Sequence, residues 1–86
     1  KHIRVSKEVL SQEVAGETVL LDLASESYFG LDEVGTRVWQ MLQEGADEES
    51  MIETLLDEYD VGREELERDI RELLGTLEKS GLVERG

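Results

Sequence analysis

The spacing of apolar residues changes once along this chain of 86 residues, near Asp32. Before that point, apolar residues often alternate with polar ones, which is the period of a half-buried strand. After it they recur every three or four residues, which is the period of an amphipathic helix. Strands grouped ahead of helices predict an α+β domain. We expect residues 1–86 to form one domain, because chains this short rarely hold two hydrophobic cores.

The first 31 residues predict a three-stranded antiparallel sheet. Residues 9–14 and 18–23 flank a short Ala-Gly-Glu turn and predict a hairpin. Residues 27–31 follow a second turn and predict the third strand. In the middle strand, Val19 and Leu21 share one face with Leu23, because side chains alternate along a strand.

Three helices are predicted after Asp32. Asp32 and Asp47 are good N-caps for the first two, Gly45 and Gly81 are natural helix ends, and the third helix spans about residues 63–80. The apolar stripes of the three helices comprise Val34, Val38, Met41 and Leu42, then Met51, Ile52, Leu55, Leu56 and Tyr59, then Leu66, Ile70, Leu73, Leu74 and Leu77.

Two short apolar segments lie near the ends of the sequence. Ile3 and Val5 alternate with charged residues, and Leu82 and Val83 follow the third helix as a short apolar tail.

The charge balance limits the partners. The chain has 22 acidic and 9 basic side chains and a net charge of −13, so it repels phosphates, and nucleic acid and anionic membranes are poor partners. A winged-helix DNA-binding protein is therefore a remote alternative, because the arginines of helix 63–80 are matched by acids. With no cysteine and no apolar run of about 20 residues, we expect a cytoplasmic protein. We also expect it to be a monomer when free.

The sequence offers little for catalysis. His2 is the only histidine, lies at the start of the chain and is expected to be solvated. The segment 57–62 resembles a calcium loop, but Tyr59 and Val61 stand where oxygen ligands are needed. We therefore expect no enzymatic activity, no metal site and no cofactor.

Two features favour a binding module instead. The predicted strand 27–31 carries no Lys, Arg or Pro that would block pairing, so an open edge there would accept an added strand. The stripe of helix 63–80 is widened by Leu73, so one flank could line a groove. The alternatives are that this helix covers the edge, with Phe29 and Leu31 in the core, and that all five apolar residues of the helix are core.

The segment 28–39, Tyr-Phe-Gly-Leu-Asp-Glu-Val-Gly-Thr-Arg-Val-Trp, resembles the PqqD-like family, as do Asp69, Leu73, Leu77 and Gly81-Leu82-Val83. Members of this family are also called RiPP recognition elements. The resemblance spans residues 3–84 and implies a small winged helix-turn-helix-like fold with no activity of its own. It also implies that the leader of a ribosomally made precursor peptide binds as a strand between the third strand and the third helix.

The resemblance places the peptide site on Ser27, Tyr28, Phe29, Gly30 and Leu31 of the strand and on Arg63, Leu66, Asp69, Ile70, Leu73 and Leu77 of the helix. Within the family, the chain is most similar to the free-standing proteins that bind lasso-peptide precursors and deliver them to a leader peptidase. Their leaders carry a Tyr-x-x-Pro motif, which Leu66, Ile70 and Leu73 could hold in an apolar pocket. The alternative within the family is the carrier of pyrroloquinoline quinone biosynthesis.

Overall fold

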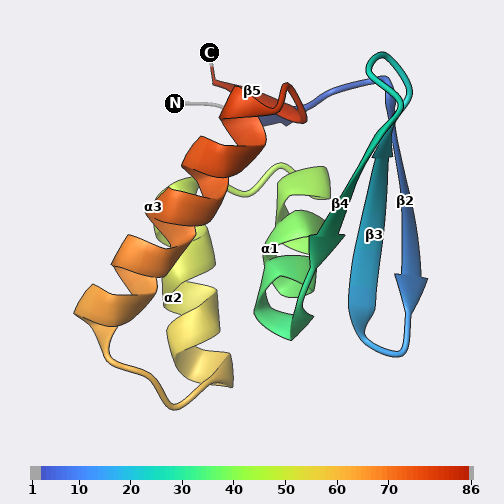
Figure 1. Cartoon of the computed structure of the whole chain (residues 1–86). Coiled ribbons are helices and arrows are strands. Elements are labelled where there is room, and N and C mark those ends of the chain that lie inside the picture. Colours follow the sequence, from blue (N-terminus) through green and yellow to red (C-terminus); the bar gives the residue numbers. More distant parts are fainter. Residues whose placement is uncertain (1–2, 86) are drawn as a thin grey trace.

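The computed structural model describes residues 3–85 and confirms the α+β class (Figure 1). His2 lies outside the described residues. A three-stranded antiparallel sheet precedes three helices, as predicted. The elements are β1 (Ile3–Val5), β2 (Val9–Val14), β3 (Glu17–Asp22), β4 (Ser27–Leu31), α1 (Glu33–Gln43), α2 (Glu48–Glu58), α3 (Arg63–Lys79) and β5 (Val83–Arg85).

The larger sheet has the order β2-β3-β4, with β3 in the middle. Its first hairpin turns at Ala15 and Gly16, whose φ angles of 54° and 83° are those of a tight two-residue turn that matches the twist of the strands. The pairing of β3 with β4 runs from Thr18 opposite Leu31 to Asp22 opposite Ser27. β4 is therefore an edge strand of this sheet.

The buried face of β3 is the opposite of the one that its apolar residues suggest. Val19 and Leu21 do share a face, but Val19 is 45 % exposed and Leu23, just beyond the strand, is 49 % exposed. The face that packs on α1 carries Leu20, which is fully buried, between Thr18 and Asp22. Hydropathy alone favours the wrong face here, because two polar residues occupy buried positions.

Asp22 is tolerated inside because the following turn satisfies its carboxylate. One oxygen accepts from the backbone N–H of Ala24 at 3.2 Å, and the other accepts from the hydroxyl of Ser25 at 2.8 Å. A buried carboxylate with hydrogen-bond donors on both oxygens avoids most of the cost of desolvation.

The two ends of the chain pair with each other, which corrects the interpretation of Leu82 and Val83 as a tail. β1 and β5 form a two-stranded antiparallel ladder with Val5 opposite Val83, and the N–H of Ser6 donates to the carbonyl of Leu82 at 2.9 Å. Val83 is 1 % exposed. Gly81, with φ +77°, ends α3 as predicted and turns the chain into β5.

The first two helices begin at the predicted caps. The carboxylates of Asp32 and Asp47 accept from the N–H groups of Gly35 and Ser50, each at 2.8 Å. The hydrogen bonds from Ser50 lower the pKa of Asp47 below its usual value. None of the helices in residues 3–85 has the length and apolar character needed to cross a bilayer.

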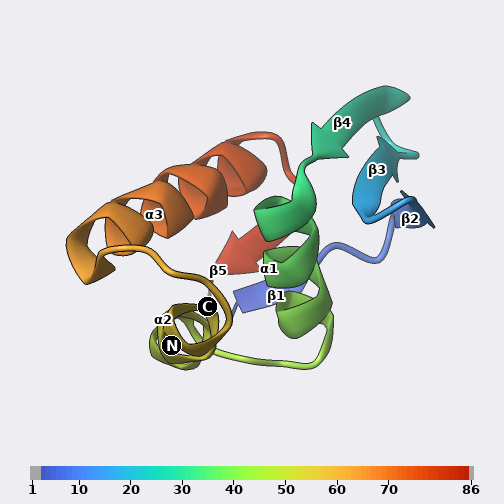
Figure 2. The ribbon, with the colours of Figure 1, turned by 90° about the horizontal axis from the view of Figure 1, so that it is seen from below.

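The hydrophobic core lies around α1, which stands between the three-stranded sheet and the pair α2 and α3 (Figure 2). The core comprises Ile3, Leu20, Leu31, Val38, Trp39, Met41, Leu42, Met51, Ile52, Leu55, Leu66, Ile70, Leu74, Leu77, Leu82 and Val83. It draws on both sheets and all three helices, so the relative positions of these elements depend on one another.

The orientation of β3 can be tested with two neighbouring substitutions. Leu20→Ala should lower the free energy of unfolding by about 2–5 kcal/mol, because it leaves a cavity in the core. Val19→Ala, on the exposed face, should change it by less than about 1 kcal/mol. Urea denaturation followed by circular dichroism measures both values, and equal losses would contradict this orientation.

Candidate functional site

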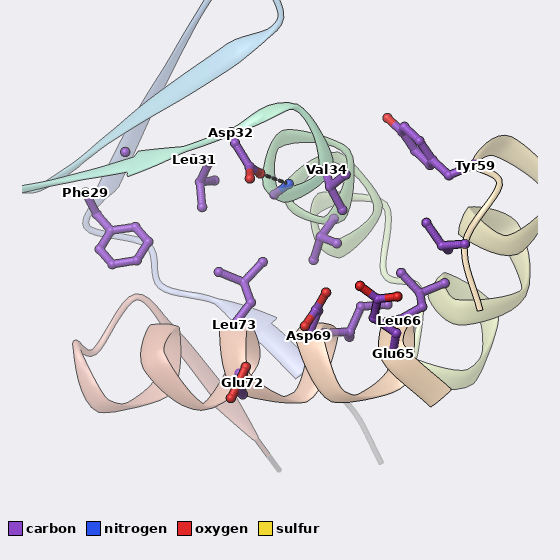
Figure 3. Close-up of a pocket in the computed structure, with 15 residues that line it drawn as sticks. Phe29, Leu31, Asp32, Val34, Tyr59, Glu65, Leu66, Asp69, Glu72 and Leu73 are labelled. Atoms are coloured by element: carbon purple, nitrogen blue, oxygen red, sulfur yellow. Dashed lines mark hydrogen bonds between the residues drawn. The ribbon is translucent and has the colours of Figure 1, made fainter. Parts of the chain in front are cut away.

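A cleft of about 550 Å³ lies between β4 and α3 (Figure 3). The start of α1 and the segment after α2 line one end of it. Its lining residues are Phe29, Gly30, Leu31, Asp32, Val34, Gly35, Val38, Tyr59, Val61, Glu65, Leu66, Asp69, Ile70, Glu72 and Leu73.

One wall of the cleft is the unpaired edge of β4. Within residues 3–85, β4 pairs with β3 alone, and α3 stands across the cleft from its other edge. Leu31 is buried and also belongs to the core, whereas Phe29 is half-buried. At Gly30, no atom beyond the neighbouring residues lies within 4 Å of the position that a Cβ would take, so the face of β4 opposite Phe29 and Leu31 is uncovered there. The edge is therefore open, and α3 does not cover it.

The opposite wall is one flank of α3. Leu66 and Ile70 are buried against the core and also line the cleft, while Leu73 is half-buried and points across the cleft toward the side of Leu31 (Figure 3). Leu74 and Leu77 are fully buried in the core and do not line the cleft. The wide apolar stripe thus divides into a core flank and a cleft flank.

This end of the cleft contains residues that we did not assign to the site from the sequence. Val34 and Val38 of α1 line it together with Tyr59 and Val61 from the segment after α2. Val61 is 42 % exposed, and its apolar character beside Tyr59 was a signal in the sequence. Partial burial, with a smaller effect of Glu33, raises the pKa of the Tyr59 phenol above its usual value, so the hydroxyl stays protonated at neutral pH.

The charged side chains that line the cleft are all acidic among the described residues. Asp32 lies at the start of α1, and Glu65, Asp69 and Glu72 lie on α3. In Figure 3, Glu65 and Asp69 rise from α3 into the same space as Leu66. The cleft therefore combines an apolar interior with a negative rim.

Four residues of the predicted peptide site do not line this cleft. Ser27 and Tyr28 border a separate hollow of about 290 Å³ near the β3–β4 turn, and Phe29 borders both spaces. Leu77 is core. Arg63 pairs with Glu49 at 2.6 Å and with Glu67 at 2.8 Å, and the hydrogen bond to Glu49 raises its pKa. The other seven predicted residues, Phe29, Gly30, Leu31, Leu66, Asp69, Ile70 and Leu73, meet around the cleft.

Comparisons with known proteins agree on one family. The sequence profile of the family described as "Coenzyme PQQ synthesis protein D (PqqD)" matches residues 17–83. A solved structure, "TbiB1 in Complex with the TbiA(beta) Leader Peptide", is 40 % identical, with a TM-score of 0.91 and 96 % of each chain covered. A second, "Lasso peptide synthetase B1 complexed with the leader peptide", is 28 % identical, with a TM-score of 0.89, covering 99 % of this chain and 100 % of the other. Among curated proteins, none matches.

The division of α3 into two flanks predicts different costs for adjacent substitutions. Leu74→Ala should lower the free energy of unfolding by about 2–5 kcal/mol, because Leu74 is fully buried. Leu73→Ala should cost only about 1 kcal/mol, because part of this side chain already contacts solvent in the cleft. Urea denaturation of the two variants measures the difference, and a larger loss for Leu73→Ala would place that residue in the core.

Proposed function

Because this chain belongs to the PqqD family, we propose that it is a non-catalytic adaptor that binds the leader of a ribosomally made precursor peptide and delivers it to a leader peptidase in lasso-peptide biosynthesis. The observation that supports this proposal most directly is the open edge of β4 facing the apolar flank of α3 across the cleft. Both similar structures described above are complexes with leader peptides.

The proposed binding mode is the addition of one antiparallel strand to β4. The backbone of the leader would satisfy the N–H and C=O groups on the free edge of Ser27–Leu31, which supplies affinity without regard to sequence. Leader side chains would alternate between two faces, as they do along β4, where Phe29 and Leu31 face the helices. Alternate leader residues would therefore enter the cleft and supply specificity.

The end of the cleft beside Tyr59 suits a large apolar or aromatic side chain. Val34, Tyr59, Val61 and Leu66 surround this end, and Tyr59 keeps a neutral hydroxyl that can donate or accept a hydrogen bond. A leader with a Tyr-x-x-Pro motif could place its ring there, and the rigid proline would lower the entropy lost on ordering the peptide.

The contribution to processing would come from effective concentration rather than chemistry. An adaptor that holds the leader while it contacts the peptidase converts a second binding event into an intramolecular one.

A second candidate function follows from the description of the family profile, coenzyme PQQ synthesis, in which the same cleft would carry the quinone precursor peptide.

The first experiment is fluorescence polarisation with labelled peptides. One peptide is the TbiA(beta) leader, one is a lasso leader with Tyr-x-x-Pro, one is a quinone-precursor peptide, and double-stranded DNA is the control. Saturable binding to lasso leaders alone is the expected result. Binding to the quinone precursor alone would select the second candidate, and binding to none of the peptides, or to DNA, would contradict the adaptor.

One substitution on the cleft flank of α3 and one matched control outside the cleft test the binding site in the same assay. Leu73→Glu should abolish leader binding, because it places a charge in the apolar wall. Thr76→Glu adds the same charge to an exposed position one turn along α3, outside the cleft, and should leave Kd within about twofold. Circular dichroism checks the fold of both variants, and loss of structure in Leu73→Glu alone would assign Leu73 to the core.

Strand addition also predicts a pattern of hydrogen exchange. Saturating leader should slow the exchange of backbone amides on the free edge of β4, within residues 27–31. The outer edge of β2, residues 9–14, is the internal control and should exchange at an unchanged rate. Two-dimensional NMR in D₂O resolves both strands. Protection confined to α3 would indicate instead that the leader binds without pairing to β4.

A further inference from the structure

Two groups of charged residues lie on different sides of α3. Arg63 and Arg71 face α2, where they pair with Glu49 at 2.6 Å and Glu48 at 3.2 Å. Glu67 lies between the two arginines and contacts both, at 2.8 Å and 3.9 Å. The two arginines on this side of α3 are therefore already paired with glutamates of the protein itself.

The side that faces the cleft is different. Glu65, Asp69 and Glu72 follow one another at intervals of four and three residues, which places them along one line of the helix surface. Within residues 3–85, neither Glu65 nor Glu72 forms a salt bridge. Among the same residues, the one salt bridge of Asp69 is with Arg68, at 3.9 Å, and both side chains are more than half exposed, so this pair contributes little.

This acidic line is part of the cleft rather than a separate surface. Glu65 and Asp69 rise beside Leu66 into the space across from β4 (Figure 3). On the other side of the cleft, Asp32 adds a further carboxylate, which accepts from the N–H of Gly35. A peptide in the cleft thus meets apolar walls and negative charge from both sides.

We propose that α3 selects leader peptides that carry lysine or arginine at alternate positions, on the side that faces Glu65 and Asp69. This inference rests on the proposed function and names the class of leader. Alternate side chains of a strand lie about 6.6–7 Å apart, and residues four apart on a helix are separated by about 6 Å along its axis, so two cations can meet two acids. Their aliphatic stems would cover Leu66 and Leu73 while the charged heads reach the carboxylates.

The same arrangement would reject acidic leaders. A glutamate at either position would face Glu65 or Asp69 without a counter-charge, and the net charge of −13 would add to the repulsion. Exposed ion pairs each change affinity by between about 1.4-fold and 5-fold, so two of them can separate a cationic from an acidic leader by about tenfold or more.

The test uses derivatives of the TbiA(beta) leader in which one pair of alternate polar positions at a time is replaced by two lysines or by two glutamates. For at least one pair, the lysine derivative should bind the wild-type protein about tenfold more tightly than the glutamate derivative. This preference should shrink as NaCl is raised from about 0.05 M to about 0.5 M, because exposed charges are screened.

The protein variants locate the effect. Glu65→Lys combined with Asp69→Lys should reverse the preference, and Glu65→Gln combined with Asp69→Asn should remove it. The matched control, Glu53→Lys with Glu64→Lys, changes the net charge by the same amount at exposed positions outside the cleft and should keep the preference for lysine.

The outcomes separate this inference from the function on which it rests. If the leader binds but both double variants at 65 and 69 keep the wild-type ratio of Kd values, the charge selection is wrong and the adaptor remains. If the control variant reverses the preference as well, the effect comes from net charge and not from the cleft, which also overturns the inference. If no peptide binds the wild-type protein, the adaptor is wrong and this inference falls with it.

Discussion

The open edge of β4 depends on the packing of α1 between two sheets. One side of α1 packs on β3 through the buried Leu20, and another contacts β1, which pairs with β5 at the end of α3. Together these contacts hold α3 at a distance from β4. β4 therefore keeps an unpaired edge across the cleft from the apolar flank of α3. Monomeric proteins usually protect such an edge, because it can pair with another chain. Here the fold maintains it, as the proposed binding of an extended peptide requires.

Different faces of α3 contact the core, the cleft and α2. Leu74 and Leu77 bury one flank in the core, Leu66 and Leu73 line the cleft, and Arg63 with Arg71 joins the helix to α2. The helix also lacks a side-chain N-cap, since Gly62 precedes it. Packing and ion pairs along its length therefore hold it in place more than local signals at its start. The acidic residues are left on the side that faces the cleft.

Much of the candidate site could be predicted because it lies on regular elements. The periodicity of α3 placed Leu66, Ile70 and Leu73 on one side, and the lack of Lys, Arg and Pro in residues 27–31 indicated an open edge. Val34, Val38, Tyr59 and Val61 were missed because they come from two segments, α1 and the residues after α2, that only tertiary packing brings together. Arg63 was assigned to the peptide site, yet its partners are Glu49 and Glu67, and no spacing rule shows which of two faces an arginine will take.

The sequence by itself determined that a three-stranded sheet precedes three helices, the caps at Asp32 and Asp47 and the turn at Gly81, because these depend on local backbone chemistry and on the spacing of side chains. Only the tertiary structure decided which face of β3 is buried, since Asp22 becomes acceptable inside once Ser25 and the N–H of Ala24 satisfy it. It alone also decided that Val5 pairs with Val83, 78 positions away in the sequence. Such pairing depends on contacts between distant segments, and the local pattern of neither segment encodes it.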